Sequence, residues 1–332
     1  MLQPANDSSN YYRLLKTKME AELLLSAIRL EVFTFLSVPS SLKELAEQTG
    51  YDVRNLGFFL RALVASGFIE QQGGLYANTR EGAEFLSKES PLYLGDTLLF
   101  RDGLNSLEGV DEKVRRGAIS RQSAADVSHY EFARLARVVV PEMYLGRVQA
   151  FIGSLKELTE NVEPPVRLLD LGGGAGIMAV EFVRAFPGAS AVVFEHPAVA
   201  AVARETAEKR GVSERVSIVE GDFNRDGIGE NFDVIVASGI LDFAKDDLEG
   251  LLKKISAALN PRGLFYLVRR KNDEEGLLGW LPGLLDGRDS ILDVKSIDEN
   301  VRKCGFEQLR PIEAGRFLGE FYRKRRNSPQ DS

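Results

Sequence analysis

The residues best suited to chemistry form a glycine-rich turn, Asp170-Leu171-Gly172-Gly173-Gly174-Ala175-Gly176. The apolar run 166–169 before it is typical of a buried strand, and the apolar-periodic segment 177–183 after it is typical of a helix. A strand, a glycine turn and a helix form the first unit of a nucleotide-binding α/β half. Because glycine has no Cβ, such a turn can bend sharply and approach a ligand closely. The sequence therefore predicts a ligand site at this turn.

Two acidic residues follow, each at the end of a predicted strand. Glu195 ends the strand 189–195, where its carboxylate can accept hydrogen bonds from both ribose hydroxyls of an adenosine. Asp222 and Phe223 follow the strand 216–219, where they suit an adenine amino group and the face of its ring. The simpler interpretation is an exposed strand-end glutamate and a loop aspartate beside a core phenylalanine. Because open α/β sheets bind ligands at the carboxyl ends of their strands, we favour an adenosine site.

The glycine spacing distinguishes two kinds of adenosine ligand. A dinucleotide site reads G-x-G-x-x-G, whereas position 177 of this chain is an isoleucine. The pattern D-x-G-G-G-x-G resembles motif I of methyltransferases that depend on S-adenosylmethionine (SAM). It favours SAM over a nicotinamide dinucleotide and a methyltransferase over an oxidoreductase.

The N-terminal part has a winged-helix pattern of three helices and a hairpin. The predicted elements are a helix at 12–36, a helix after the capping box Ser41–Glu44, a helix at 53–66 and a hairpin around Gly73-Gly74. The third helix is rich in Leu and Phe and has only two arginines, whereas base readout needs exposed polar and basic side chains. We therefore expect a dimerisation module and no nucleic-acid partner.

From Pro164-Pro165 onward, strands and helices alternate, which predicts a parallel sheet with right-handed crossovers. Segments 306–312 and 317–322 predict a final antiparallel hairpin. The fold class is thus α/β, a Rossmann-like methyltransferase sheet after a mostly helical winged-helix domain. We expect the dimerisation domain at 1–98, a helical linker lining the pocket at 99–163 and the SAM-binding domain at 164–332.

Composition narrows the remaining classes of protein. The 332 residues carry a net charge of −7, which argues against a general nucleic-acid binder. One cysteine and two histidines argue against a disulfide framework and a metal site. The N-terminus has no signal-peptide pattern, and no apolar run approaches membrane-spanning length, so we expect a cytoplasmic protein without a membrane partner.

Together these motifs resemble the plant-type small-molecule O-methyltransferase family, which includes caffeate, hydroxyindole and many bacterial natural-product enzymes. The matching segments are 168–176, Glu195-His196-Pro197, Gly221-Asp222-Phe223 and 259–263, and the resemblance covers nearly the whole chain. It implies a homodimer, a small-molecule acceptor, and SAM as methyl donor with S-adenosylhomocysteine as product. Carried over by position, the implied cofactor-binding residues are Asp170, Gly172, Gly174, Glu195, Asp222, Phe223 and Ser238.

The chain departs from this family at the catalytic base. Relatives have a histidine before Asp-Trp that removes a proton from the acceptor hydroxyl, but Leu241 occupies that position and cannot accept a proton. Three explanations remain open: a base elsewhere, a reaction that depends on positioning alone, or a SAM-binding protein that has lost methyl transfer. The candidates for another base are His129, Tyr130, Glu142, Tyr144 and Asp242.

A basic run, Arg269-Arg270-Lys271, ends the fifth predicted strand, where many relatives have an acidic residue. We expect it either to pair with a carboxylate or phosphate of the substrate or to form a solvated strand end.

Overall fold

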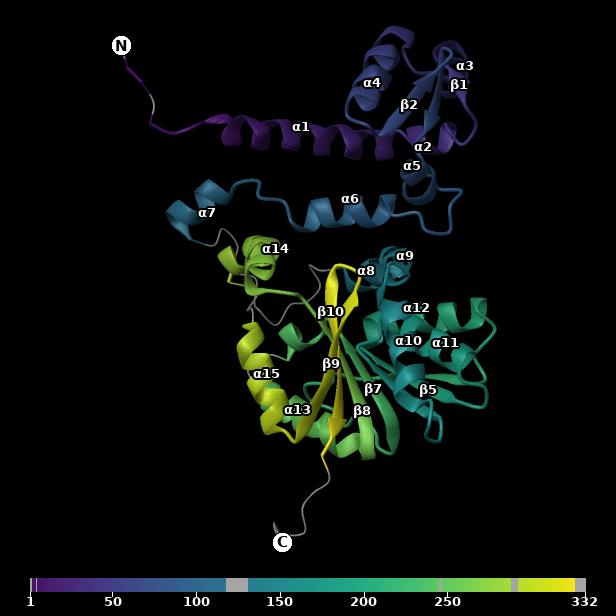
Figure 1. Cartoon of the computed structure of the whole chain (residues 1–332), viewed down its shortest axis with the longest axis vertical. Helices are drawn as coiled ribbons and strands as arrows, with labels where there is room; N and C mark the ends of the chain where they lie inside the picture. Colours follow the sequence, from purple (N-terminus) through teal and green to yellow (C-terminus); the bar gives the residue numbers. More distant parts are fainter. Residues whose placement is uncertain (1, 4, 118–130, 245–246, 288–291, 326–332) are drawn as a thin grey trace. The chain divides into compact units, whose positions relative to one another are not determined.

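The chain forms two compact units, Met1–Asp102 and Gly103–Ser332 (Figure 1). The computed structural model describes all residues except 1, 4, 118–130, 245–246, 288–291 and 326–332. Among the described helices, none is long and apolar enough to cross a membrane.

The first unit has the predicted winged-helix arrangement. Its elements are α1 (Ser9–Arg29), α2 (Val32–Phe35), β1 (Ser40–Ser41), α3 (Leu42–Thr49), α4 (Val53–Ala65), β2 (Ile69–Gln72), β3 (Leu75–Asn78) and α5 (Arg80–Phe85). The capping box is present, because Ser41 Oγ accepts from Glu44 N and the Glu44 carboxylate accepts from Ser41 N. The strands pair antiparallel in the order β1-β3-β2. Helix α4 turns Leu56, Leu60 and Leu63 into the core of its own unit.

The second unit is a seven-stranded sheet covered by helices. Its strands are β4 (Arg167–Leu171), β5 (Ser190–Glu195), β6 (Val216–Glu220), β7 (Phe232–Ser238), β8 (Leu259–Arg269), β9 (Phe306–Ala314) and β10 (Phe317–Lys324). Their order is β6-β5-β4-β7-β8-β10-β9. The first five strands in this order are parallel, and the β9–β10 hairpin adds to β8 antiparallel. The predicted fold class is confirmed. Pro311 lies in β9, the edge strand of the sheet, as predicted for a proline that cannot donate to a ladder on both sides.

Helices of this unit precede, alternate with and follow the strands. They are α7 (Val110–Arg116), α8 (Phe132–Val138), α9 (Val140–Met143), α10 (Arg147–Thr159), α11 (Ile177–Ala185), α12 (Pro197–Lys209), the 3₁₀ turn η2 (Leu241–Phe243), α13 (Leu248–Ala258), α14 (Asp273–Leu285) and α15 (Val294–Lys303). Helix α6 (Gly95–Leu104) spans the unit boundary. The helices of segment 103–163, predicted as part of a linker, thus belong to the sheet unit.

Two apolar layers fix the central strands, one on each face of the sheet. Val234 and Val236 of β7 belong to the layer that contains Phe151 of α10 and Phe182 of α11. Ile235 and Ala237 belong to the opposite layer, which includes Leu252 of α13 and Val301 of α15. Strands covered on both faces read as near-continuous apolar runs, which is why the sequence revealed them. This packing fixes the position of the last residue of each strand at the carboxyl edge of the sheet.

Candidate functional site

The glycine turn begins where β4 ends, and its backbone is left-handed at three glycines, Gly172, Gly174 and Gly176. Gly172 and Gly174 have φ values of +62° and +59°, in the left-handed region that side chains disfavour. A Cβ on Gly172 would lie 2.7 Å from Ile240 Cγ2, and one on Gly174 would lie 3.7 Å from Ala136 Cβ of α8. The turn is therefore held between the segment after β7 and helix α8.

Glu195, the last residue of β5, binds the turn through its carboxylate. Gly174 N donates to Oε2 and His196 N donates to Oε1, each at 2.7 Å. Burial raises the pKa of Glu195, and these two backbone N–H groups oppose that rise. An ionised carboxylate has about four acceptor positions, so two stay available for a diol such as a ribose.

Asp170 of β4 contacts the same turn through its carboxyl group. Its side chain is buried, and Ala179 N of α11 donates to Oδ2 at 3.3 Å. A Cβ on Gly173 would lie 2.6 Å from Asp170 Cγ, so the turn rests directly on this carboxyl group. Burial raises the pKa of Asp170 to about 7, with a smaller contribution from the nearby Glu195 charge.

Asp222 lies in a tight turn after β6, next to the end of β5. Gly221 N donates to Glu195 O at 3.0 Å, which ties the start of this turn to the strand end. Asn224 N donates to Asp222 Oδ1 at 2.9 Å, and Asp222 N donates to the Asp226 carboxylate at 2.8 Å. These bonds fix the direction of the Asp222 carboxylate, while Phe223 packs partly buried against the α13–α15 layer.

Ser238 ends β7, the strand on the other side of β4. The register pairs Leu171 with Ala237, which brings Ser238 level with the start of the glycine turn. Its hydroxyl is buried and has no hydrogen-bond partner among the residues that the structure describes. Buried polar groups are normally satisfied, so the hydrogen-bonding capacity of this hydroxyl is unused among these residues. The carboxyl edge of β7-β4-β5-β6 thus gathers the predicted cofactor-binding residues.

The candidate bases occupy separate networks. Arg147 and Arg316 both donate to Glu142 Oε1, at 3.3 and 2.9 Å, which links α9 and α10 to the β9–β10 turn. Tyr144 Oη donates to Glu181 Oε1 at 2.7 Å. Burial and this hydrogen bond raise the pKa of Tyr144 to about 12, so the phenol stays protonated at neutral pH.

Asp242 is held by the end of β8. Arg270 Nη1 lies 2.9 and 2.7 Å from its two carboxylate oxygens, and Leu292 N donates to Oδ1 at 3.2 Å. Leu241 beside it is 3% exposed and packs into the α13–α15 layer. The remaining two candidates, His129 and Tyr130, lie outside the described residues.

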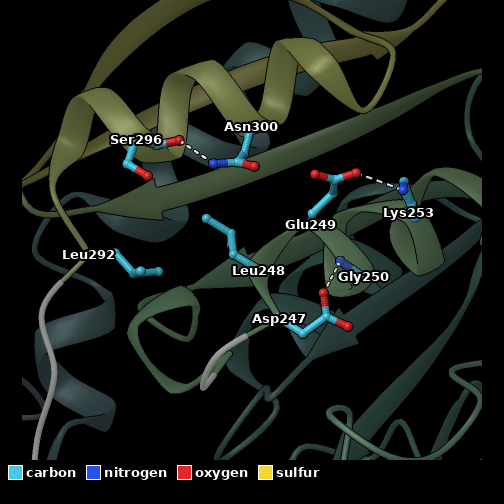
Figure 2. A pocket seen from close by; sticks show the side chains of 8 residues that line it. All are labelled: Asp247, Leu248, Glu249, Gly250, Lys253, Leu292, Ser296 and Asn300. Atoms are coloured by element: carbon cyan, nitrogen blue, oxygen red, sulfur yellow. Dashed lines mark hydrogen bonds and ion pairs between the residues drawn. The ribbon is translucent and has the colours of Figure 1, made fainter.

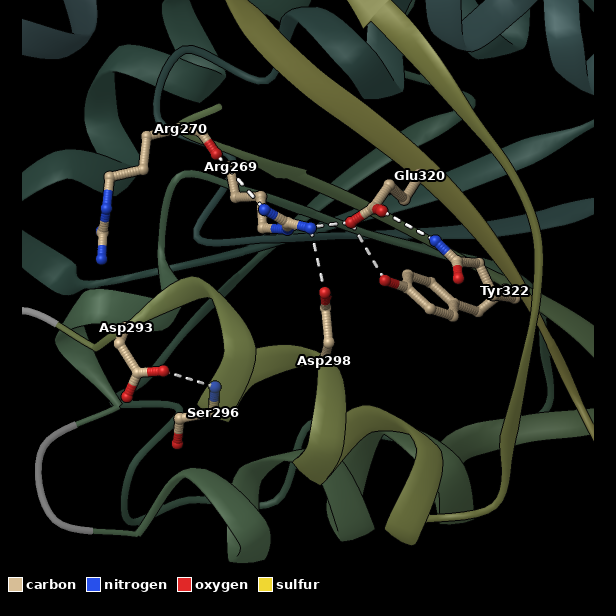
Figure 3. Close-up of polar contacts among 8 residues, drawn as sticks. Arg269, Arg270, Asp293, Ser296, Asp298, Glu320 and Tyr322 are labelled. Atoms are coloured by element: carbon tan, nitrogen blue, oxygen red, sulfur yellow. Dashed lines mark hydrogen bonds and ion pairs between the residues drawn. The ribbon is translucent and has the colours of Figure 1, made fainter. Parts of the chain in front are cut away.

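The basic run has counter-charges within the protein (Figure 3). Arg269 Nε donates to Glu320 at 2.8 Å and Nη2 to Asp298 at 3.1 Å, joining β8 to β10 and α15. Lys271 pairs with Glu313 at 2.9 Å. Since Arg270 binds Asp242, all three basic residues make contacts within the chain. Pairing with a substrate anion, one of the two alternatives, finds no support here. A fully solvated strand end, the other alternative, does not fit Arg269, which is buried.

A groove of about 530 Å³ lies between the starts of α13 and α15 (Figure 2). Its polar groups bind one another: the Asp247 carboxylate accepts from Gly250 N, and Glu249 pairs with Lys253. None of its lining residues is one of the predicted site residues. This groove is therefore separate from the glycine turn.

Sequence reasoning missed the aromatic contacts beside the site. Phe243 of η2 lies edge-on to Phe132 of α8 at 5.5 Å and to Trp280 of α14 at 5.6 Å between ring centroids. The three residues are far apart in the sequence, so no local pattern joins them. Their contacts connect the segment after β7 to the helices on either side.

Comparison with known proteins decides the family. The O-methyltransferase domain model matches residues 152–276, and the O-methyltransferase dimerisation domain model matches residues 12–88. The tetracenomycin polyketide synthesis 8-O-methyl transferase TcmO of Streptomyces glaucescens is 30% identical over 80% of this chain and 82% of its own. This chain belongs to the O-methyltransferase family.

Other similarities extend over nearly the full length of this O-methyltransferase. The N,N-dimethyltransferase OxyT of Streptomyces rimosus is 25% identical over 96% of each chain. Human N-acetylserotonin methyltransferase, solved in complex with SAM, has the same fold, with a TM-score of 0.74 and 22% identity over 98% of this chain and all of that one. The predicted family and activity class, a SAM-dependent methyltransferase, are confirmed.

The buried Asp170 carboxyl group predicts a pH dependence of stability without cofactor. Its pKa is about 7 in the folded state, above the ordinary aspartate value of 3.8, so the folded state binds the extra proton between those two pH values. Stability of the wild type relative to Asp170→Asn should therefore fall as pH rises from about 4 to 7, by about 1–3 kcal/mol, and then level off. Urea unfolding of both proteins at several pH values measures this difference, and a difference independent of pH would contradict the assignment.

The burial of Leu241 predicts that a histidine placed at this position does not act as a base. Leu241→His should destabilise the protein by about 2–3 kcal/mol, because it places an imidazole in an apolar layer. Leu241→Met, a substitution of similar volume, should cost less than about 1.5 kcal/mol. Urea unfolding compares the two variants. A histidine variant of wild-type stability with increased methyl transfer would show that position 241 faces the acceptor.

Proposed function

We propose that the carboxyl edge of β7-β4-β5-β6 binds SAM and presents its methyl group to a small-molecule acceptor. The observation that carries this proposal is the Glu195 carboxylate, fixed by Gly174 N and His196 N with acceptor positions to spare. The buried Ser238 hydroxyl, which has no hydrogen-bond partner in the described part of the chain, and the left-handed backbone at Gly172 and Gly174 support it. The hydroxyl would supply a polar contact to the ligand, and the glycine turn would supply backbone groups at the same edge.

Each residue has a distinct task in this proposal. Glu195 accepts hydrogen bonds from the two ribose hydroxyls, and Asp222 accepts one from the adenine amino group with Phe223 along the ring. Gly172 and Gly174 allow close approach of the backbone, Asp170 holds the turn, and Ser238 contacts the ligand beside it. When bound, SAM supplies an electrophilic methyl group on its sulfonium.

The acceptor atom would attack that methyl carbon in line, the carbon–sulfur bond would break to release S-adenosylhomocysteine, and a proton on the acceptor would pass to solvent water. Glu142, Tyr144 and Asp242 are each engaged by other side chains, so we assign them no proton transfer. Holding the acceptor in line is then the catalytic contribution that we assign to the described residues, and Leu241 takes no part in proton removal. TcmO and OxyT, by their names, methylate oxygen and nitrogen, which supports a small molecule bearing either atom as the acceptor.

Substitution of Glu195 tests the cofactor site. Glu195→Gln removes the charge and turns an amide group toward a backbone donor, so S-adenosylhomocysteine should bind at least about tenfold more weakly. Calorimetric titration measures this change. Glu220→Gln, at the end of neighbouring β6 where Glu220 pairs with Arg204, is the matched control and should bind like wild type.

Transfer of labelled methyl from SAM to phenol, amine and thiol acceptors completes the test. We expect methylation by wild type and by Glu220→Gln. Absence of S-adenosylhomocysteine binding to wild type would contradict the proposed site. Binding without transfer to any acceptor would favour the alternative, a SAM-binding protein that has lost methyl transfer.

We also propose that the protein is a homodimer formed through its first unit. The dimerisation domain model covers this unit, and the first half of α1 has a set of apolar side chains that are 54–72% exposed: Tyr11, Tyr12, Leu14, Leu15 and Met19. Exposed apolar groups at this density on one helix are typical of a contact with a partner.

Placing a charge on this helix tests the interface. Leu15→Arg should shift the protein toward the monomer, because an unpaired guanidinium would be buried at the contact. Thr17→Arg adds the same group two residues away and should leave the dimer intact. Light scattering after size exclusion gives both masses, and a wild type with the mass of one chain would contradict the proposal.

A further inference from the structure

The turn 222–226, which contains Asp222, is bound by one lysine of α13. Lys254 Nζ donates to Phe223 O and to Asp226 O, both at 2.9 Å. The two carbonyls flank the turn, one directly after Asp222 and one at its end. An ammonium group has three donors, so a single side chain can satisfy both carbonyls at once. Lys254 thereby fixes two points of the turn relative to α13.

A second anchor holds the middle of the same turn. Asn224 Nδ2 donates to Phe243 O of η2 at 3.1 Å, while Asn224 N donates to Asp222 Oδ1 at 2.9 Å. The direction of the Asp222 carboxylate thus depends on the position of Asn224. Asn224 in turn lies between the two carbonyls that Lys254 binds. The two anchors together leave the carboxylate little freedom to rotate.

We propose that Lys254 is a positioning residue that sets the preference of the site for adenine. This inference rests on the proposed function, in which Asp222 accepts a hydrogen bond from the adenine amino group. A hypoxanthine ring has a carbonyl oxygen at that position, which would face the carboxylate and repel it. The preference requires the carboxylate to stay in place, because a relaxed turn would let it move away from the oxygen. Lys254 acts through the turn and does not touch the base.

The test compares two ligands on matched variants of the full chain. S-adenosylhomocysteine and S-inosylhomocysteine are titrated calorimetrically into wild type, Lys254→Met, Lys254→Arg and Lys253→Met. Wild type should prefer the adenosyl ligand by at least about tenfold. Lys254→Met should bind the adenosyl ligand about tenfold more weakly, with little change for the inosyl ligand, so that the preference is lost. Lys254→Arg keeps N–H donors and should recover most of it.

The neighbouring lysine provides the control. Lys253 is exposed and pairs with Glu249 instead of the turn, so Lys253→Met should keep the wild-type preference. If Lys254→Met does not fold, Asn224→Ala removes the other anchor and should reduce the preference in the same way. Equal weakening of both ligands, or an unchanged preference in Lys254→Met and Asn224→Ala, would overturn the inference. Failure of wild type to bind S-adenosylhomocysteine would instead contradict the proposed function, and this inference with it.

Discussion

The site depends on one half-buried carboxylate, that of Glu195, with two backbone partners. Glu195 lies at the end of β5, where burial alone would raise the pKa of its carboxyl group and favour the neutral form. Gly174 N and His196 N compensate by donating to its two oxygens. Charge-assisted hydrogen bonds of this kind are about twice as strong as neutral ones. They fix the glycine turn relative to β5, so the ligand edge has its shape before any ligand binds.

The neighbouring strands extend this arrangement in both directions. On one side, Gly221 N joins the Asp222 turn to the end of β5, and Lys254 and Asn224 hold that turn in place. On the other side, Ile240 packs against Gly172, which sets the path of the chain from Ser238 into η2. In the proposed function, the residues that would face adenine and those that follow Ser238 are thus parts of one connected edge.

Local patterns in the sequence predicted the sheet, the glycine turn, Glu195 and Asp222, because each depends on a strand and the few residues that follow it. The strand 166–169 in fact continues to Leu171, so Asp170 is buried within β4. What the sequence could not show are partners distant in the chain. Asp242 was a plausible base until Arg270 was placed beside it.

Distant partners also determine the contacts of the basic run 269–271 and of the turn that contains Asp222. Arg269 donates to Glu320, which lies fifty-one positions later in the chain. Lys254 donates to the carbonyl of Phe223, which lies thirty-one positions earlier. Such pairings depend on sheet order and helix placement, which no short motif encodes.

A crystal structure of the full chain with S-adenosylhomocysteine tests the central claim most directly. The account predicts both ribose hydroxyls within about 2.6–3.0 Å of the Glu195 carboxylate and the adenine beside Asp222. A ligand bound elsewhere, or a ribose turned away from Glu195, would contradict it.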